Sequence, residues 1–252
     1  MIKIKNADEI RLMREAGQIT DAARQAAGKL VEPGITTREI DNEVRKVIKS
    51  LGAKPSFLGL YGFPAACCCS VNDEVIHGIP GNRKILDGDI VKIDVGAFYG
   101  GFHGDCAATF AAGTISEEAK KLIEVTRQSF YEGIRYAREG YRISDISHAI
   151  QEYNEKHGYS LVREYVGHGI GSAMHEEPEV PNYGRPGHGP RLVAGMTIAI
   201  EPMVNMGKPG VYSLPDGWTV KTADGSLSSH FENTVLITKG DPVILTADHT
   251  KA

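Results

Sequence analysis

Two carboxylates on either side of a short glycine-containing turn are the first residues in this sequence that could do chemistry. Asp94 lies at the end of the run 89–95, where apolar and polar residues alternate, and Asp105 lies in a second extended run. A period of two residues is typical of β-strands, so the pattern predicts a hairpin. With the turn centred on Tyr99 and Gly100, Asp94 is expected directly opposite Asp105. Like charges at that separation are destabilising, so the pair needs a shared proton or a cation. A longer turn would instead leave both acids on a solvated edge of the sheet.

Two further acids occupy strand-like runs in the second half of the chain. Glu201 lies in the run 198–202 and Glu232 in the run 231–237, whereas Lys92 is the one basic residue at a comparable position. A buried carboxylate costs several kcal/mol unless it is paired or binds a metal. The four acids and the glycine-flanked His168 form an oxygen-rich set that suits two divalent ions, such as Mn²⁺, Fe²⁺, Co²⁺ or Zn²⁺. Two such ions, about 3.5–4 Å apart, can activate a water, so the set predicts a hydrolase.

Two other histidines are candidates to act on a substrate. His77 belongs to a second His-Gly-Ile motif, which matches the one at His168, and His175 precedes two glutamates. Either imidazole could contact a substrate or stabilise the charge of a tetrahedral intermediate. A lone histidine is more often a surface or core residue, and that alternative stays open here. The glycines beside His77 and His168 predict room for a ligand near the backbone.

The elements that must position these residues repeat along the chain. Capping residues and helical spacing predict helices over 6–29, 36–51, 116–134 and 144–156, with extended segments at 66–71 and 75–79. The second helix pair matches the first at an offset of 106 residues, as in Ile40 with Ile146 and Gly52 with Gly158. This repeat indicates a duplication, with halves of about 1–113 and 114–252 in one catalytic domain, 1–252.

Composition narrows the class of protein. The 252 residues are 41% hydrophobic and 24% charged, as in ordinary globular proteins, and the net charge is −4. No basic stripe or tail points to nucleic acid or an anionic membrane surface. Neither a signal peptide nor an apolar run of membrane-spanning length is found, so we expect a cytoplasmic protein without membrane contact. The cysteines at 67, 68, 69 and 106 are expected to be reduced and buried.

Seven motifs together resemble the type I methionine aminopeptidases over nearly the whole chain. They are His77–Pro80, Asp87–Val91, Gly101–Asp105, Gly167–Gly171, Met174–Pro178, Glu201–Pro202 and Asp216–Thr222. The resemblance implies an α/β (α+β) "pita-bread" fold, like that of creatinase and the aminopeptidases, with two pseudo-symmetric ααββ halves around a central antiparallel sheet. It also implies release of the initiator methionine from nascent polypeptides whose second residue is small.

Site residues follow from the same resemblance. It assigns two divalent ions to Asp94, Asp105, His168, Glu201 and Glu232, with Asp105 and Glu232 bridging. Substrate contact is assigned to His77 and His175, and assistance in proton transfer to Glu201. Phe63 and Trp218 resemble walls of the methionine pocket, although Trp218 could also be plain core.

The sequence also indicates the subtype within this family and the positions where the chain differs from the usual family pattern. The interval between Glu201 and Glu232 has no room for the helical subdomain of type II enzymes, and no Cys- and His-rich extension precedes Ile2. The chain therefore resembles the short bacterial form. His230 and Asn233 stand where the family more often has Gln and His, and Leu60 stands where an aromatic residue is common, which affects the surroundings of the ligands and the pocket.

Two other functions stay open on the sequence. A proline-specific aminopeptidase or dipeptidase would share the ligands but usually carries an additional N-terminal domain. A non-catalytic relative that binds RNA or protein would have lost ligands that this chain retains. We also expect the protein to be a monomer that contacts the ribosome transiently and does not bind nucleic acid specifically.

Overall fold

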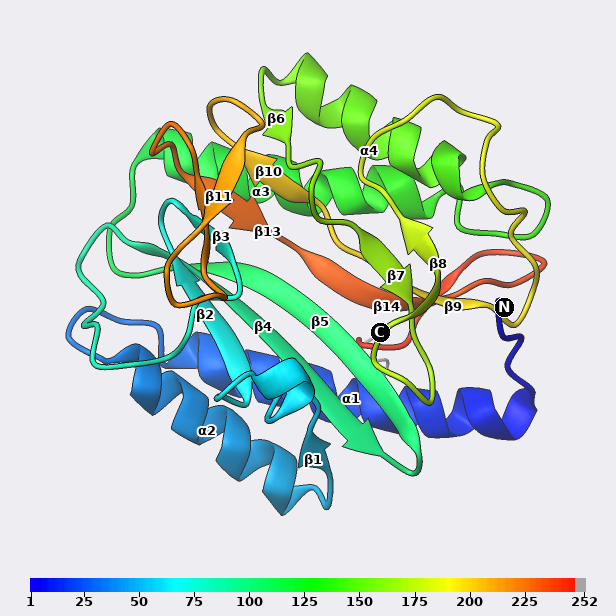
Figure 1. Cartoon of the computed structure of the whole chain (residues 1–252), viewed down its shortest axis with the longest axis horizontal. Coiled ribbons are helices and arrows are strands. Elements are labelled where there is room, and N and C mark those ends of the chain that lie inside the picture. The colour runs from blue at the N-terminus through cyan, green and yellow to red at the C-terminus, as the bar shows by residue number, and fades with distance from the viewer. Residues whose placement is uncertain (248–252) are drawn as a thin grey trace.

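Two pairs of helices alternate with two groups of strands along the chain (Figure 1). The computed structural model describes residues 1–247. The helices are α1 (Ala7–Lys29), α2 (Thr37–Ser50), α3 (Glu117–Ile134) and α4 (Ile143–Lys156), with a short 3-10 helix at Leu60–Gly62. Each predicted helix is present, and each pair precedes the strands of its own half.

The main sheet is antiparallel, with strands in the order β1-β4-β5-β14-β9-β7-β8, while β2 pairs with β4 and β15 with β14. Its strands are β1 (Lys54–Pro55), β2 (Cys67–Val71), β4 (Ile90–Tyr99), β5 (Phe102–Ala111), β7 (Gly167–Gly169), β8 (Glu176–Val180), β9 (Thr197–Ile200), β14 (Glu232–Leu236) and β15 (Val243–Ile244). Two smaller sheets combine β6 (Ser160–Leu161), β10 (Met203–Asn205) and β13 (Ser228–His230), and β3 (Glu74–Ile76), β11 (Val211–Ser213) and β12 (Val220–Thr222).

Local capping explains where the helices begin. Asn6 and Thr36 each accept the backbone N–H of a glutamate three residues later, and that glutamate accepts the N–H of the cap in return. Ser116 caps α3 in the same position, as predicted. The fourth helix begins at Ile143 rather than Ser144, because Asp145 accepts the backbone N–H of Arg142 and adds a residue to the first turn.

Each helix pair covers its own group of strands with a separate apolar core. The first core joins α1 and α2 to β2 and β4 through residues such as Ile40, Val44 and Ile93. The second joins α3 and α4 to β9 and β14 through residues such as Leu122, Ile146 and Ile198. The paired positions Ile40 and Ile146 of the sequence repeat are therefore equivalent core residues. In Figure 1 the blue helices α1 and α2 lie at the bottom of the view, and the green helices α3 and α4 lie at the top, with strands of the main sheet between them.

The central hairpin differs in register from the sequence prediction. Its turn centres on Gly100 and Gly101, with Tyr99 paired to Phe102, so that Asp94 lies opposite Ala107 rather than Asp105. Both glycines have positive φ, 59° and 92°, as a two-residue turn that follows the strand twist requires. The predicted turn at Tyr99 was wrong because a non-glycine residue would have had to adopt that backbone conformation.

Candidate metal centre

Five neighbouring strands of the main sheet each deliver one candidate ligand. Asp94 lies on β4, Asp105 on β5 and Glu232 at the start of β14, while Glu201 directly follows β9 and His168 is the middle residue of β7. These strands are consecutive in the sheet, in the order β4-β5-β14-β9-β7. Residues separated by up to 138 positions in the sequence thus meet along one row of the sheet, and both halves of the chain contribute.

The register brings the acids onto one face. Asp94 and Glu232 both have Ala107 of β5 as their Cα partner, and Asp105 lies two residues from Ala107. Residues two apart on a strand share a face, so Asp105 is a diagonal neighbour of Asp94 rather than its direct opposite. The pairing of Asn233 with Ile200 places Glu201, one residue further, across from Glu232. The carboxylates are gathered as predicted, in a different register.

Burial leaves these acids without a compensating cation among the described residues. Asp94 Oδ1, Asp105 Oδ1 and Glu232 Oε1 are buried and have no hydrogen-bond partner. Lys92, the basic residue considered from the sequence, donates instead to the backbone oxygen of Asn72 at 2.6 Å. A buried polar atom without a partner costs about 1–3 kcal/mol, and more when it is charged. The acids therefore need protons or metal ions.

The pKa values of the clustered carboxyls indicate that protons can take the place of metal ions. Burial raises the pKa of Asp105 to about 7, even though its interactions with the Asp94 and Glu232 carboxyls act to lower it. Burial, followed by the charge of Asp105, raises the pKa of Asp94, Glu201 and Glu232 well above the usual range. Without metal, the cluster holds shared protons at neutral pH.

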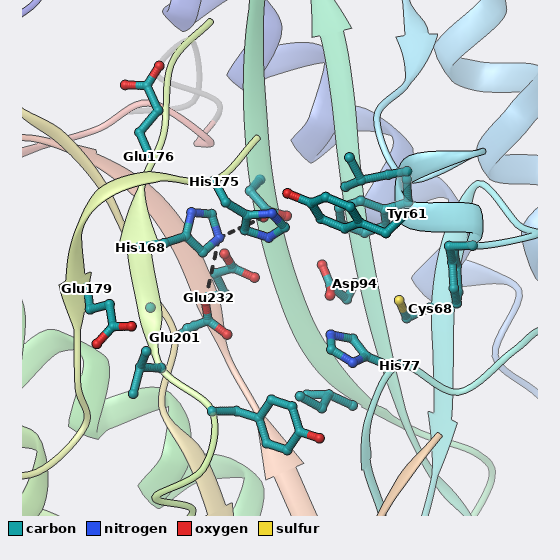
Figure 2. A pocket seen from close by; sticks show the side chains of 18 of the residues that line it. Tyr61, Cys68, His77, Asp94, His168, His175, Glu176, Glu179, Glu201 and Glu232 are labelled. Carbon is teal, nitrogen blue, oxygen red and sulfur yellow. Dashed lines mark ion pairs between the residues drawn. The ribbon is translucent and has the colours of Figure 1, made fainter. Parts of the chain in front are cut away.

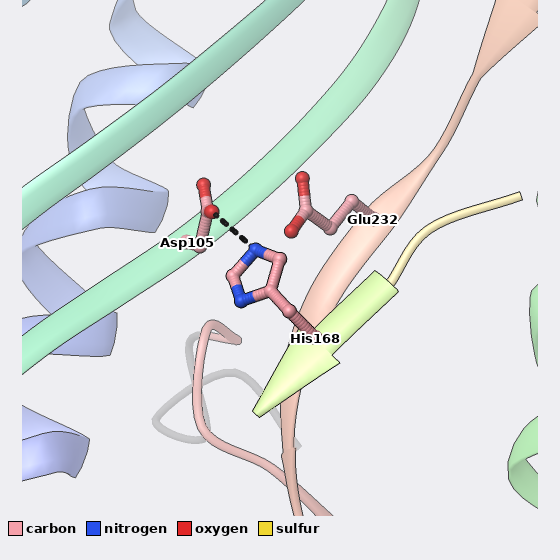
Figure 3. Close-up of side chains that lie close together, drawn as sticks. All are labelled: Asp105, His168 and Glu232. Carbon is pink, nitrogen blue, oxygen red and sulfur yellow. Dashed lines mark ion pairs between the residues drawn. The ribbon is translucent and has the colours of Figure 1, made fainter. Parts of the chain in front are cut away.

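His168 faces the carboxylates with its Nε2 atom (Figure 3). The distance from this nitrogen is 3.6 Å to Asp105 Oδ2 and 3.7 Å to Glu201 Oε1. Its Nδ1 lies 2.9 Å from the backbone oxygen of Gly169, which fixes Nδ1 as the protonated nitrogen and leaves the lone pair on Nε2. One oxygen each of Asp105 and Glu232 and one nitrogen of His168 lie within 4.8 Å of one another. These donors fit a divalent ion.

A cavity of about 610 Å³ opens beside the carboxylates and contains all five candidate ligands in its lining (Figure 2). Phe63 and Trp218 form part of its wall and pack edge to face, with ring centroids 5.1 Å apart. The family resemblance assigned Phe63 and Trp218 to the wall of the methionine pocket, and in the structure both line this cavity. The cavity therefore joins a polar cluster to an apolar wall, as in a site for a small apolar side chain.

Both predicted substrate histidines line this cavity (Figure 2). His77 follows β3 with a φ of 59°, which ends the strand at Ile76 and overturns the extended segment expected to residue 79. Burial and the neighbouring His175 lower the pKa of His77 to about 4, so it is neutral at neutral pH. His175 is exposed at the cavity mouth, and its ring lies 4.4 Å from the His168 ring.

The glycines beside these histidines serve strand packing rather than ligand access. A Cβ on Gly78 would lie 2.3 Å from the backbone oxygen of Cys69, and one on Gly169 would lie 2.1 Å from that of Glu177. The space next to each glycine is thus filled by a neighbouring strand. The predicted room for a ligand at these backbones was wrong, because the close approach is internal to the protein.

Sequence reasoning missed several residues of the cavity. Tyr165 packs edge to face on His77 with ring centroids 5.8 Å apart, and Tyr61 stacks on His175 at 5.9 Å. Cys68 lines the cavity, and it is free and buried as the sequence predicted for all four cysteines. Neither Tyr165 nor Tyr61 belongs to a periodic pattern or motif that would have marked it. His230, noted only as a departure, lies within the acid cluster.

Comparison with known proteins agrees with this geometry. Residues 11–239 match metallopeptidase family M24. The chain belongs to this family. Methionine aminopeptidases from Clostridium perfringens and Bacillus subtilis are 57% and 51% identical to it, and each alignment covers 98% of this chain and 99% of the relative. The predicted resemblance is confirmed, and the M24 chain is a metal-dependent hydrolase of the methionine aminopeptidase group.

Solved structures confirm the pita-bread fold of this M24 chain. A methionine aminopeptidase from Thermotoga maritima superposes with a TM-score of 0.97 at 45% identity, covering 98% of this chain and all of the other. Prolidase from Pyrococcus furiosus superposes with a TM-score of 0.79 at 26% identity, and the match covers 66% of that chain. Within residues 1–247, no helix has the length and apolarity needed to cross a membrane.

Proposed function

We propose that this chain removes the initiator methionine from nascent polypeptides whose second residue is small, and that it does so in the cytoplasm. The observation that carries the proposal is the row of five ligands on five neighbouring strands, which opens into a cavity with an apolar wall. Near full-length similarity to methionine aminopeptidases supports it. Both halves of the chain supply ligands, which supports a single catalytic domain over 1–252.

The ligand set is proposed to hold two divalent ions, with Asp105 and Glu232 shared between them. Orphaned carboxylate oxygens on Asp94, Asp105 and Glu232 support this assignment, since each needs a positively charged partner. Bound divalent ions would polarise the scissile carbonyl and lower the pKa of a water at the site. Displacement of protons from the cluster is part of loading, because the carboxyls hold them when metal is absent.

The remaining steps belong to side chains of the cavity. Glu201 lies at the end of β9 beside the acid cluster, where its carboxylate can accept a proton from the attacking water. His175, at the cavity mouth, can donate a hydrogen bond to the carbonyl oxygen as negative charge develops. His77, neutral at neutral pH, can bond the substrate backbone from the part of the wall where it packs against Tyr165 and Trp218. Phe63 and Trp218 would contact the methionine side chain.

A peptide series tests the proposal. Metal-loaded protein should cleave Met-Ala-Ser and Met-Gly-containing peptides, and should leave Met-Lys and Met-Phe peptides about 10²-fold less reactive, because a bulky second residue displaces the scissile bond. Equal cleavage across the series would refute the narrow subsite. Preference for an Ala-Pro peptide would favour the proline-specific function instead. If the metal-loaded protein cleaved none of these peptides, the proposed peptidase activity would be refuted.

A further inference from the structure

His230 is a fully buried histidine for which the proposed mechanism has no role. It ends β13 and is 1% exposed. Thr109 fixes its backbone from both sides: the threonine hydroxyl oxygen accepts the His230 N–H at 3.0 Å and lies 2.9 Å from the His230 carbonyl oxygen. Within the described chain, neither ring nitrogen has a hydrogen-bond partner. A buried imidazole with two unpaired nitrogens is costly, so an unfilled interaction is expected at this ring.

The ring of His230 points at the metal cluster. Its Nε2 atom lies 3.7 Å from Glu201 Oε2 and 3.9 Å from Glu232 Oε2. Both distances exceed the 2.7–3.2 Å range of an N–H···O hydrogen bond. Two atoms that bind the same ion can lie at such distances, because metal–nitrogen and metal–oxygen bonds of about 2.0–2.2 Å allow ligand atoms up to about 4 Å apart.

The proposed ligand His168 has the same geometry. Its Nε2 lies 3.6 Å from Asp105 and 3.7 Å from Glu201. Glu201 therefore stands between two imidazoles, with Oε1 toward His168 and Oε2 toward His230. Two groups of three possible ligand atoms result, Asp105 with His168 and Glu232, and Glu201 with His230 and Glu232. Any geometric reason to count His168 as a ligand applies equally to His230.

We propose that His230 is a metal ligand, binding through Nε2 together with Glu201 and Glu232. The proposal rests on the function proposed above, in which this cluster holds divalent ions. The metal centre would then have two nitrogen donors, His168 and His230, whereas the sequence predicts only His168. Imidazole suits Co²⁺, Zn²⁺ and Fe²⁺, whereas carboxylates and water suit Mn²⁺, so His230 should shift the metal preference away from Mn²⁺.

Proton NMR of the Co²⁺-loaded protein tests the assignment. A histidine bound to paramagnetic Co²⁺ through one nitrogen shows a strongly shifted resonance from the N–H of its other nitrogen. We expect two such resonances in the unmodified protein, one in His230→Gln and one in the matched control His168→Gln. Co²⁺ affinity, measured by calorimetry, should fall by about tenfold or more in both variants. Thermal melts of the metal-free proteins check that each variant folds.

Three outcomes would overturn the proposal. One is a single shifted N–H that persists in His230→Gln and disappears in His168→Gln. Another is weak Co²⁺ binding in His230→Ala that His230→Gln restores, because glutamine keeps a hydrogen-bond donor for Glu201 but supplies no imidazole. In either case, cleavage of Met-Ala-Ser by the unmodified protein would leave the proposed function standing. The third is unmodified protein that binds no Co²⁺, which would overturn the proposed function as well.

Discussion

Asp94 lies diagonally across the β4–β5 ladder from Asp105, opposite Ala107, and the two buried carboxyls share one face of the sheet. Burial is the main cause of the raised pKa of both carboxyls, and the charge of Asp105 raises the pKa of Asp94 further. Burial raises the pKa of Asp105 to about 7 overall. A divalent ion that binds here therefore competes with protons near neutral pH rather than in acid.

We expect metal binding to release protons at pH 6 to 7, and affinity to fall as the pH is lowered through about 7. His168 adds no competition above pH 6.5, because burial lowers its pKa below that ordinary value. Calorimetric titration with Co²⁺ in buffers of different ionisation enthalpy measures the protons released. A heat of binding that is the same in every buffer would show that the carboxyls are already ionised in the metal-free protein.

Metal should also stabilise the fold. Free metal at about a hundred times its Kd stabilises a protein by roughly 2.7 kcal/mol if it binds only the folded state. The gain should grow between about pH 5 and pH 8. Carboxyls with raised folded pKa values, such as Asp105, stabilise the metal-free fold at low pH and lose that contribution as pH rises through about 7.

The comparison must be made between loaded and metal-free protein at each pH. His77 and His230 have pKa values lowered to about 4 and about 3, so below pH 6.5 they destabilise the fold and oppose the carboxyls. Taking the difference between the two melting temperatures largely cancels the contribution of His77, which lies outside the ligand cluster. Equal melting temperatures with and without saturating metal at pH 8 would contradict a gathered acid site.

Local signals in the sequence predicted more of this structure than long-range ones. Caps such as Asn6 and Ser116 act within one helical turn, so the helices could be placed from the sequence. The hairpin register could not, because it depends on backbone angles at Gly100 and Gly101. The candidate ligands were predicted from the acids in the strands and from the family motifs, whereas Tyr165 reaches the cavity only through the path of the chain near β7.

The roles of His168 and His175 should separate in alanine variants. His168→Ala should weaken metal binding, since the Nε2 atom that faces Asp105 and Glu201 is lost. His175→Ala should keep metal and fold but lose about 10²-fold or more in turnover, because one donor to the developing charge is removed. Metal titration and kcat/KM on Met-Ala-Ser check both. If kcat/KM is unchanged in His175→Ala, His175 has no role in the mechanism. If His168→Ala binds metal as tightly as the unmodified protein does, His168 is not a ligand.

Lys5 should position His175 from the far end of the sequence. Its ammonium lies 2.8 Å from Glu176 Oε2, and both side chains are only 4% exposed. Burial alone would raise the pKa of Glu176, but hydrogen bonds from Lys5 and Lys3 lower it to about 2, so the pair stays ionised. Glu176 also accepts the backbone N–H of Ala173 at 3.2 Å, which fixes the loop that carries His175.

We expect Lys5→Met to destabilise the protein by about 3 kcal/mol or more, because it leaves a buried carboxylate without its main partner. It should also lower kcat/KM by displacing His175, while Co²⁺ affinity stays close to that of the unmodified protein. Lys3→Met is the matched control: its ammonium contacts the same carboxylate at 3.0 Å but its side chain is 55% exposed, so a cost below about 1 kcal/mol is expected. Equal effects of the two variants on melting temperature and kcat/KM would show that the charge of the segment, rather than the buried Lys5 contact, acts on the loop.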